Sequence, residues 1–237
     1  MTTAATPPNS DTGPGAQYVL DLPHRAARGR ADFIAAPANE VALRWIERWP
    51  DWPAPALALS GPADAGKSHL AQIWRDRAAA RQVAPEALGN AAVPNLLGEA
   101  RAVLIDGADR APEEPLLHLY NMLAERSGHL LLVAREPPAR WNIGLADLRS
   151  RLLAVPAIAV MPPDEALIGA LLVKLFADRR LPVSRELIAF LVLRLERSFT
   201  AAQEAVALLD RHALADHRPI TVPLARRVLG FGEERDG

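Results

Sequence analysis

The pattern of apolar positions divides the chain into two parts. In the first part, four short and largely apolar runs lie at 56–60, 102–106, 129–134 and 157–161. Runs of this length and composition are typical of strands that are buried on both faces of a sheet. Apolar residues at helical spacing occupy stretches before and between these runs, at 37–49, 68–74, 112–126 and 145–153. Strands that alternate with helices predict an α/β fold with a parallel sheet flanked by helices.

The second part, from residue 164 onward, has no strand-like run. Helical periodicity continues at 164–179, 184–196, 199–214 and 223–229. Ser184 and Ser198 precede two of these stretches, and a serine oxygen at a helix start accepts a hydrogen bond from a free backbone N–H group. We expect an α/β domain over residues 31–162, followed by a small helical lid domain over residues 163–237.

Two regions give weaker patterns. Residues 83–98 are interrupted by Pro85, Gly89 and Pro94, so we expect only one weak strand and one short helix there. Residues 1–30 begin with a stretch rich in Thr, Pro, Gly, Asn and Asp that offers almost nothing to bury. We therefore expect a disordered N-terminal tail.

Composition and charge narrow the classes of protein. The chain has 237 residues, of which 50% are hydrophobic and 23% are charged, as in ordinary globular domains. Its net charge of −1 provides no general basic field that would attract nucleic acid. The absence of cysteine excludes disulfides, thiolate metal sites and cysteine nucleophiles. With no secretory signal and no apolar run near the ~20 residues that cross a bilayer, we expect a soluble, cytoplasmic protein with no membrane partner.

Residues 61–68 follow the pattern G-x-x-x-x-G-K-S, between an apolar run and a helical stretch. A P-loop of this kind holds phosphates through backbone N–H groups and the positive end of the following helix. Lys67 would reach the outer phosphates, and the Ser68 hydroxyl would hold Mg²⁺. An ordinary strand-turn-helix without a ligand is the alternative. The residues predicted to surround the nucleotide are Gly61, Pro62, Ala63, Asp64, Ala65, Gly66, Lys67, Ser68, His69 and Asp106.

Asp106 ends the second apolar run. A carboxylate at the end of a strand beside a P-loop supplies the direct or water-mediated Mg²⁺ ligand that a triphosphate site needs. Ser68 and Asp106 are therefore the predicted metal ligands, acting through the nucleotide. Without the P-loop, a strand that merely ends on a polar residue would be the preferred interpretation.

Several further segments carry a family resemblance. They are Asp32-Phe33-Ile34-x-x-Pro37-x-Asn39, 61–70, Leu104-Ile105-Asp106, Glu136-Pro137-Pro138 and Asp147-Leu148-x-Ser150-Arg151-Leu152. With the helical lid after them, the chain resembles AAA+ ATPases of the DnaA family, and Hda is the branch it resembles most. The resemblance extends over about residues 17–230. The sequence given ends after the lid, so we expect no direct DNA-binding domain of the DnaA type.

The resemblance implies two protein partners. In the Hda branch, a tail peptide of the form Gln-Leu-x-Leu-x-Leu binds the sliding clamp, the β subunit of the DNA polymerase. Gln17, Leu20 and Leu22 fit this form, whereas Tyr18 departs from it; an edge strand of the protein's own sheet is the alternative for residues 17–22. The second implied partner is the DnaA initiator. Self-association into a homo-oligomer is left open.

Arg151 is the arginine finger that the resemblance implies. Such a residue acts in trans, on the γ-phosphate of ATP held by a neighbouring subunit. The alternative is a surface arginine in a salt bridge, and Arg149 lies close enough in the sequence to exchange roles with it.

Three residues depart from the family pattern at the phosphate site. Gly107 follows Asp106 where most AAA+ ATPases have the glutamate that polarises the attacking water. Thr200 stands in the place of the sensor 2 arginine, which contacts nucleotide in DnaA and Hda. Asp64 stands where glycine is usual, at a point where the backbone often needs positive φ, which Asp tolerates better than most residues. We therefore expect weak binding of ADP or ATP with Mg²⁺, and weak or absent hydrolysis by the chain alone.

The function that fits these features is regulation of chromosomal replication initiation. A clamp-tethered AAA+ adaptor would promote hydrolysis of DnaA-bound ATP and so inactivate the initiator. One alternative is an AAA+ ATPase that loads or remodels a helicase, against which Gly107 argues. The other is a DnaA-like initiator paralogue, which the near-neutral charge disfavours.

Overall fold

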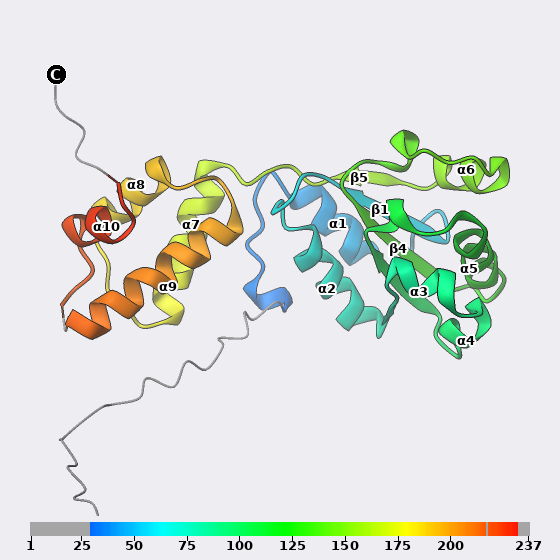
Figure 1. Ribbon diagram of the computed structural model, residues 1–237, viewed down its shortest axis with the longest axis horizontal. Coiled ribbons are helices and arrows are strands. Elements are labelled where there is room, and N and C mark those ends of the chain that lie inside the picture. Colours follow the sequence, from blue (N-terminus) through cyan, green and yellow to red (C-terminus); the bar gives the residue numbers. More distant parts are fainter. Residues whose placement is uncertain (1–28, 217, 232–237) are drawn as a thin grey trace, which may run out of the picture.

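The computed structural model describes residues 29–216 and 218–231 (Figure 1). Residues 1–28 of the predicted tail, with the clamp-binding residues 17–22, lie outside the described residues. The last two residues of that predicted tail, Gly29 and Arg30, are described, and Arg30 begins a short 3-10 helix, Arg30–Asp32. No helix in the described ranges is long and apolar enough to cross a membrane.

A five-stranded parallel sheet forms the centre of the α/β domain, in the order β2-β3-β4-β1-β5. The strands are β1 (Ala56–Ser60), β2 (Arg81–Gln82), β3 (Ala102–Asp106), β4 (His129–Ala134) and β5 (Ala157–Ala159). In the register, Asp106 lies beside Val133 of β4, and Ala134 lies beside Ser60 of β1. The carboxyl ends of β3, β4 and β1 therefore meet at one edge of the sheet. The residues that follow these strands are brought together there.

Helices cover both faces of the sheet (Figure 1). They are α1 (Glu40–Arg48), α2 (Lys67–Ala78), α3 (Pro85–Asn90), α4 (Val93–Leu97), α5 (Glu113–Glu125) and α6 (Ala146–Leu153). Leu57 and Leu59 of β1 pack with α1 and α2, whereas Ala56 and Ala58 pack with α3, α4, α5 and α6. Alternate residues of a strand point to opposite faces, so an uninterrupted apolar strand serves two cores. The predicted fold class is confirmed.

The lid is a separate group of helices at one end of the molecule (Figure 1). It consists of α7 (Glu165–Asp178), α8 (Arg185–Arg194), α9 (Phe199–Asp216) and α10 (Val222–Val228) around its own core. Both predicted serine caps are confirmed: the Ser184 hydroxyl accepts from the Leu187 N–H group at 3.1 Å, and the Ser198 hydroxyl accepts from the Ala201 N–H group at 3.0 Å.

Residues 83–98 differ from the expectation of one weak strand and one short helix, because the strand lies just before this stretch and two helices lie within it. A two-residue edge strand, β2, is followed by two short helices, α3 and α4. Pro85 is the first residue of α3 and Pro94 is the second residue of α4. Proline is favoured at the start of a helix, because the N–H group that it lacks would have no helical partner there. The two prolines therefore begin helices that the pattern had treated as interrupted.

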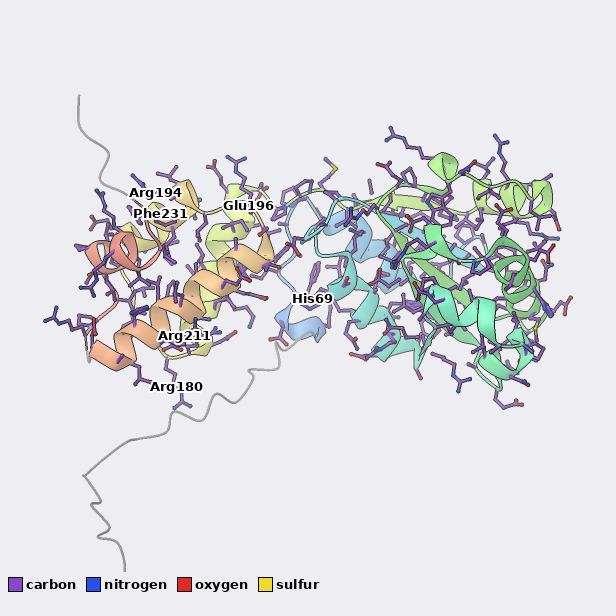
Figure 2. All side chains as sticks on the ribbon, in the orientation of Figure 1. His69, Arg180, Arg194, Glu196, Arg211 and Phe231 are labelled. Carbon is purple, nitrogen blue, oxygen red and sulfur yellow. The ribbon has the colours of Figure 1, made fainter. Side chains whose placement is uncertain are left out.

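The segment from Gly29 to Ile34 joins the two domains. Asp32 forms an ion pair of 3.1 Å with Lys174 of α7, while the next residue, Phe33, is buried in the core beside α1 and α2. Ile34 packs against the lid core. Figure 2 shows His69 of α2 at this boundary, where its ring meets Phe33 edge to face at 5.1 Å. The lid therefore contacts the 29–34 segment, which precedes α1.

Candidate functional site

The loop after β1 has the backbone conformation that its glycines allow. Gly61 has φ of 151° and Gly66 has φ of 93°. A Cβ atom on Gly61 would lie 2.2 Å from the Val160 carbonyl oxygen, so no other residue fits there without backbone movement. Asp64 also adopts positive φ, at 55°, as the sequence predicted. Asp is one of the few non-glycine residues that visits this region readily.

Lys67 is turned toward the loop itself. Its Nζ donates to the carbonyl oxygens of Gly61 at 2.7 Å and Pro62 at 2.5 Å. Burial lowers the pKa of Lys67, and the charge of Arg135 lowers it further, whereas Asp106 and Asp64 act in the opposite direction. The residue thus sits at the centre of a small group of charges. The group combines two cations, Lys67 and Arg135, which favour a bound phosphate, with two carboxylates, Asp106 and Asp64, which favour a bound cation.

Ser68 and Asp106, the predicted metal ligands, are brought together by the fold. The Ser68 hydroxyl donates to Asp106 Oδ2 at 3.3 Å, although 38 residues separate them in the chain. The parallel register explains the approach, because β3 and β1 both flank β4 and end at the same edge. Mg²⁺ prefers six oxygen ligands and usually keeps water and phosphate oxygens among them. A hydroxyl and a carboxylate at this spacing fit the protein's share of such a site.

Gly107 is required by the turn that follows β3. Its φ is 80°, and its N–H group donates to the Val133 carbonyl oxygen at 2.8 Å. A Cβ atom here would lie 2.4 Å from an Nη atom of Arg110. The position that supplies a glutamate in most AAA+ ATPases therefore has a backbone that disfavours any side chain.

The two unusual residues at the phosphate site, Asp64 and Thr200, contact each other. The Thr200 hydroxyl donates to Asp64 Oδ1 at 3.0 Å, across 136 residues of sequence. Beside this contact, the ring of Phe199 lies 3.3 Å from the position of a Cβ atom on Gly66. The first turn of α9 thus meets the P-loop directly. Sequence reasoning treated Asp64 and Thr200 as separate departures, because a pairing at this separation has no local signal.

Arg151 lies on α6, at the end of the α/β domain away from the lid (Figure 1). Its Nε donates to Asp147 Oδ1 at 3.1 Å, and its guanidinium carbon lies 5.7 Å from the centre of the Tyr120 ring. Its side chain remains 39% exposed. Arg149 is exposed on the same helix. The fold therefore does not bring Arg151 into the group of residues around Lys67.

Two further charged residues contact the predicted site residues: Arg135, which the sequence analysis did not single out, and Asp147, which it named without predicting its contact with Arg151. Arg135 follows β4, and its carbonyl oxygen accepts from the Gly61 N–H group at 3.0 Å, which places it beside the P-loop. Asp147 holds Arg151, and its spacing of four residues on a predicted helix was an available signal. Arg135 had no such signal, because only the strand order places it next to Lys67.

Comparisons with known proteins agree with this arrangement. Residues 165–229 match the family described as "Hda, lid domain". The Chromosomal replication initiator protein DnaA of Thermomicrobium roseum is 27% identical over 124 residues, which are 52% of this chain and 26% of that protein. This chain therefore spans only about a quarter of that relative's length.

Two solved structures show the same fold. Domain III of the replication initiation protein DnaA from Thermotoga maritima superposes with a TM-score of 0.72 at 18% identity, covering 86% of this chain and 96% of that one. AMPPCP-bound DnaA from Aquifex aeolicus gives a TM-score of 0.65 at 15% identity, over 78% of this chain and 68% of that one.

The solved structures show the fold, and the lid match adds a similarity to one particular family. The three comparisons agree, because each finds a similarity to DnaA or Hda proteins. The chain accordingly has the fold of the DnaA structures, is similar in sequence to a DnaA protein over about half of its length, and matches the Hda family in its lid.

Proposed function

We propose that this protein regulates replication initiation by completing the ATP site of DnaA, and that it turns over its own nucleotide slowly or not at all. The observation that carries the proposal is the separation of two features within one chain. At the chain's own P-loop, the backbone of Gly107 after β3 disfavours the glutamate that would polarise an attacking water. Arg151, in contrast, is partly exposed on a helix that lies away from this loop. Such a chain is poorly equipped for its own hydrolysis but suited to assist a neighbour.

The chain's own P-loop would hold an adenine nucleotide, ADP or ATP, with Mg²⁺. Gly61 through His69 and Asp106 would surround it, with Lys67 on the phosphates and the Ser68–Asp106 pair toward the metal ion. Binding would be weak, because Asp64 carries a negative charge on the loop and Thr200 takes the place of a cation on the lid. The nucleotide's role would be to stabilise the assembly of lid and α/β domain.

Arg151 would act on the ATP that DnaA holds. Charge accumulates on the transferred phosphoryl group, and an arginine from a neighbouring subunit stabilises that charge. The planar guanidinium can bridge two phosphate oxygens, whereas an ammonium is a single point donor. Because Arg151 is partly exposed and its only ion pair in the described residues is with Asp147 on its own helix, it can exchange that partner for a phosphate.

Residues 17–22 would tether the protein to the sliding clamp in the cytoplasm. The support for this part is the sequence alone, since the peptide lies outside the described residues. An extended peptide with Gln17 as a hydrogen-bonding residue and Leu20 and Leu22 as apolar anchors matches a common recognition mode.

The test measures hydrolysis of DnaA-bound ATP in the presence of DNA-loaded clamp. Arg151→Ala and Arg151→Lys are expected to lose the stimulation, and arginine fingers contribute on the order of 10³–10⁵ in rate. Arg149→Ala is the matched control on the same helix and is expected to keep most of the activity. If Arg149→Ala loses stimulation and Arg151→Ala keeps it, the finger is Arg149. If wild-type protein fails to stimulate, the adaptor proposal is wrong.

Clamp tethering needs its own measurement. Gln17→Ala and Leu20→Ala/Leu22→Ala variants are expected to bind the clamp weakly in surface plasmon resonance, while Arg151→Ala binds normally. If both tail variants bind the clamp as tightly as the wild type, residues 17–22 are not the clamp-binding peptide.

One observation favours a second candidate function. The assembled Ser68–Asp106 pair and Lys67 are the parts that a working ATPase also needs. An AAA+ ATPase that loads or remodels a helicase would show its own turnover near the ~1–100 per second common in phosphoryl transfer, lost in Lys67→Ala.

A further inference from the structure

We propose that α5 carries two positioning residues for Arg151: Glu113, which fixes the start of α6, and Tyr120, which orients the guanidinium. The inference rests on the proposed function, in which Arg151 acts on a neighbour's ATP. It assigns to α5 the task of holding that arginine in place before a partner arrives.

Glu113 holds the backbone that leads into α6. Its Oε1 accepts from the Gly144 N–H group at 2.9 Å, and its Oε2 accepts from the Leu145 N–H group at 2.6 Å. Leu145 is the residue at the N-cap position of α6. One carboxylate thus binds two consecutive amides, and hydrogen bonds to a charged acceptor are short and strong. Glu113 therefore fixes where α6 begins, from 31 residues away in the sequence.

Tyr120 lies seven residues further along α5, two turns later and so on the same side of the helix. It is only 7% exposed, and its ring lies 5.7 Å from the guanidinium carbon of Arg151. Asp147 binds the same guanidinium at 3.1 Å. The arginine is therefore held between an aromatic ring and a carboxylate, and the ring belongs to the helix that also fixes the start of α6.

The space between these two contacts is filled by apolar packing. Leu116 and Leu119 of α5 share a core with Leu148 and Leu152 of α6. The contacts from α5 therefore hold α6 at its start, along its buried face and at Arg151. A catalytic side chain held in this way loses less freedom on reaching its target, and small displacements of such groups can cost on the order of 10² in rate. Positioning of this kind affects the rate in the assembled complex more than its affinity.

The enzymatic test separates rate from affinity. Stimulated hydrolysis of DnaA-bound ATP is measured as a function of protein concentration for Glu113→Gln and Tyr120→Leu. Both are expected to lower the maximal rate about tenfold while the half-saturating concentration changes less than about twofold. Glutamine offers one acceptor oxygen and presents an amide to the second N–H group, so it cannot replace the carboxylate.

Two matched variants act as controls. Tyr120→Phe keeps the ring and is expected to retain the wild-type maximal rate. Glu114→Gln alters the exposed neighbour of Glu113 and is expected to change nothing. The proposal is overturned if Glu113→Gln and Tyr120→Leu keep the maximal rate, or if they raise only the half-saturating concentration.

A second measurement does not depend on DnaA. The Nε–Hε resonance of Arg151, identified by its loss in Arg151→Lys, reports the ring beside the guanidinium in NMR spectra. It is expected to shift in Tyr120→Leu and to stay close to wild type in Tyr120→Phe.

If wild-type protein fails to stimulate DnaA, the proposed function is wrong, and this resonance alone decides whether α5 orients Arg151. An unchanged resonance in Tyr120→Leu would contradict the positioning role. Because Tyr120 is buried, thermal denaturation must show that Tyr120→Leu folds; if it does not, Glu113→Gln at the exposed end of α5 decides.

Discussion

Asp64→Gly tests whether the P-loop's unusual carboxylate limits nucleotide binding. The substitution removes a negative charge from the loop, removes the acceptor of the Thr200 hydroxyl, and places a glycine where φ is 55°. These changes act on two different quantities, the free energy of unfolding and the affinity for nucleotide.

The effect on folding stability is expected to be small. The exposed hydrogen bond to Thr200 contributes about 0.5–1 kcal/mol, and its loss destabilises. Glycine adopts positive φ without strain, which offsets the loss by about 1 kcal/mol. The net change is therefore within about 1 kcal/mol of zero. For nucleotide, removal of one like charge beside the phosphates at a partly solvated site is worth about 1 kcal/mol, or about a fivefold tighter dissociation constant.

The assay is titration of wild type and Asp64→Gly with ADP and ATP by calorimetry, at two salt concentrations. Thr200→Val is the matched control, because it removes the donor while keeping the shape of the side chain and the Asp64 charge. If the charge limits binding, only Asp64→Gly binds more tightly, and the gain shrinks at high salt. If the lid contact limits binding, both variants gain. Unchanged or weaker binding by Asp64→Gly would refute the reasoning.

Three further predictions concern the α/β domain. Gly107→Glu should not restore hydrolysis in a steady-state ATPase assay, because φ of 80° disfavours any side chain there; turnover near 1 per second would contradict this. Gly61→Ala should destabilise by about 2–4 kcal/mol in chemical denaturation, because its Cβ atom would lie 2.2 Å from a carbonyl oxygen; a change below about 1 kcal/mol would contradict it. Burial lowers the pKa of His129, so the unfolded chain binds more protons below about pH 6.5 and stability falls on acidification. His129→Phe should reduce the stability difference between pH 7.5 and pH 5.5 in chemical denaturation, and a difference as large as that of the wild type would contradict this.

The sequence predicted the parts of the site that lie close together in the chain. The P-loop, the buried strand that ends at Asp106 and the serine caps of the lid each have a local pattern of residue types. The approach of Ser68 to Asp106 could also be expected, because parallel strands end at the same edge of a sheet. These features follow from periodicity and spacing alone.

Other features depend on tertiary contacts that leave no local pattern. The Thr200–Asp64 hydrogen bond joins the lid to the loop across most of the chain. Glu113 binds two backbone N–H groups, which any sequence offers, so its role is invisible before the fold is known. Asn39 belonged to the family resemblance without a stated role; it is buried, and its side chain binds the backbone of Ala36 and Ile34.

The central claim is that this chain promotes hydrolysis at another protein's ATP site and not at its own. The most direct measurement follows a single turnover of γ-labelled ATP that is preloaded either on DnaA or on this chain, mixed with the other protein, DNA-loaded clamp and excess unlabelled ATP. We expect label on DnaA to be released at least tenfold faster when the chain is present, and label on the chain to be hydrolysed slowly whether or not DnaA is added. Faster hydrolysis of the label carried by this chain, with none of the DnaA-bound label stimulated, would contradict it.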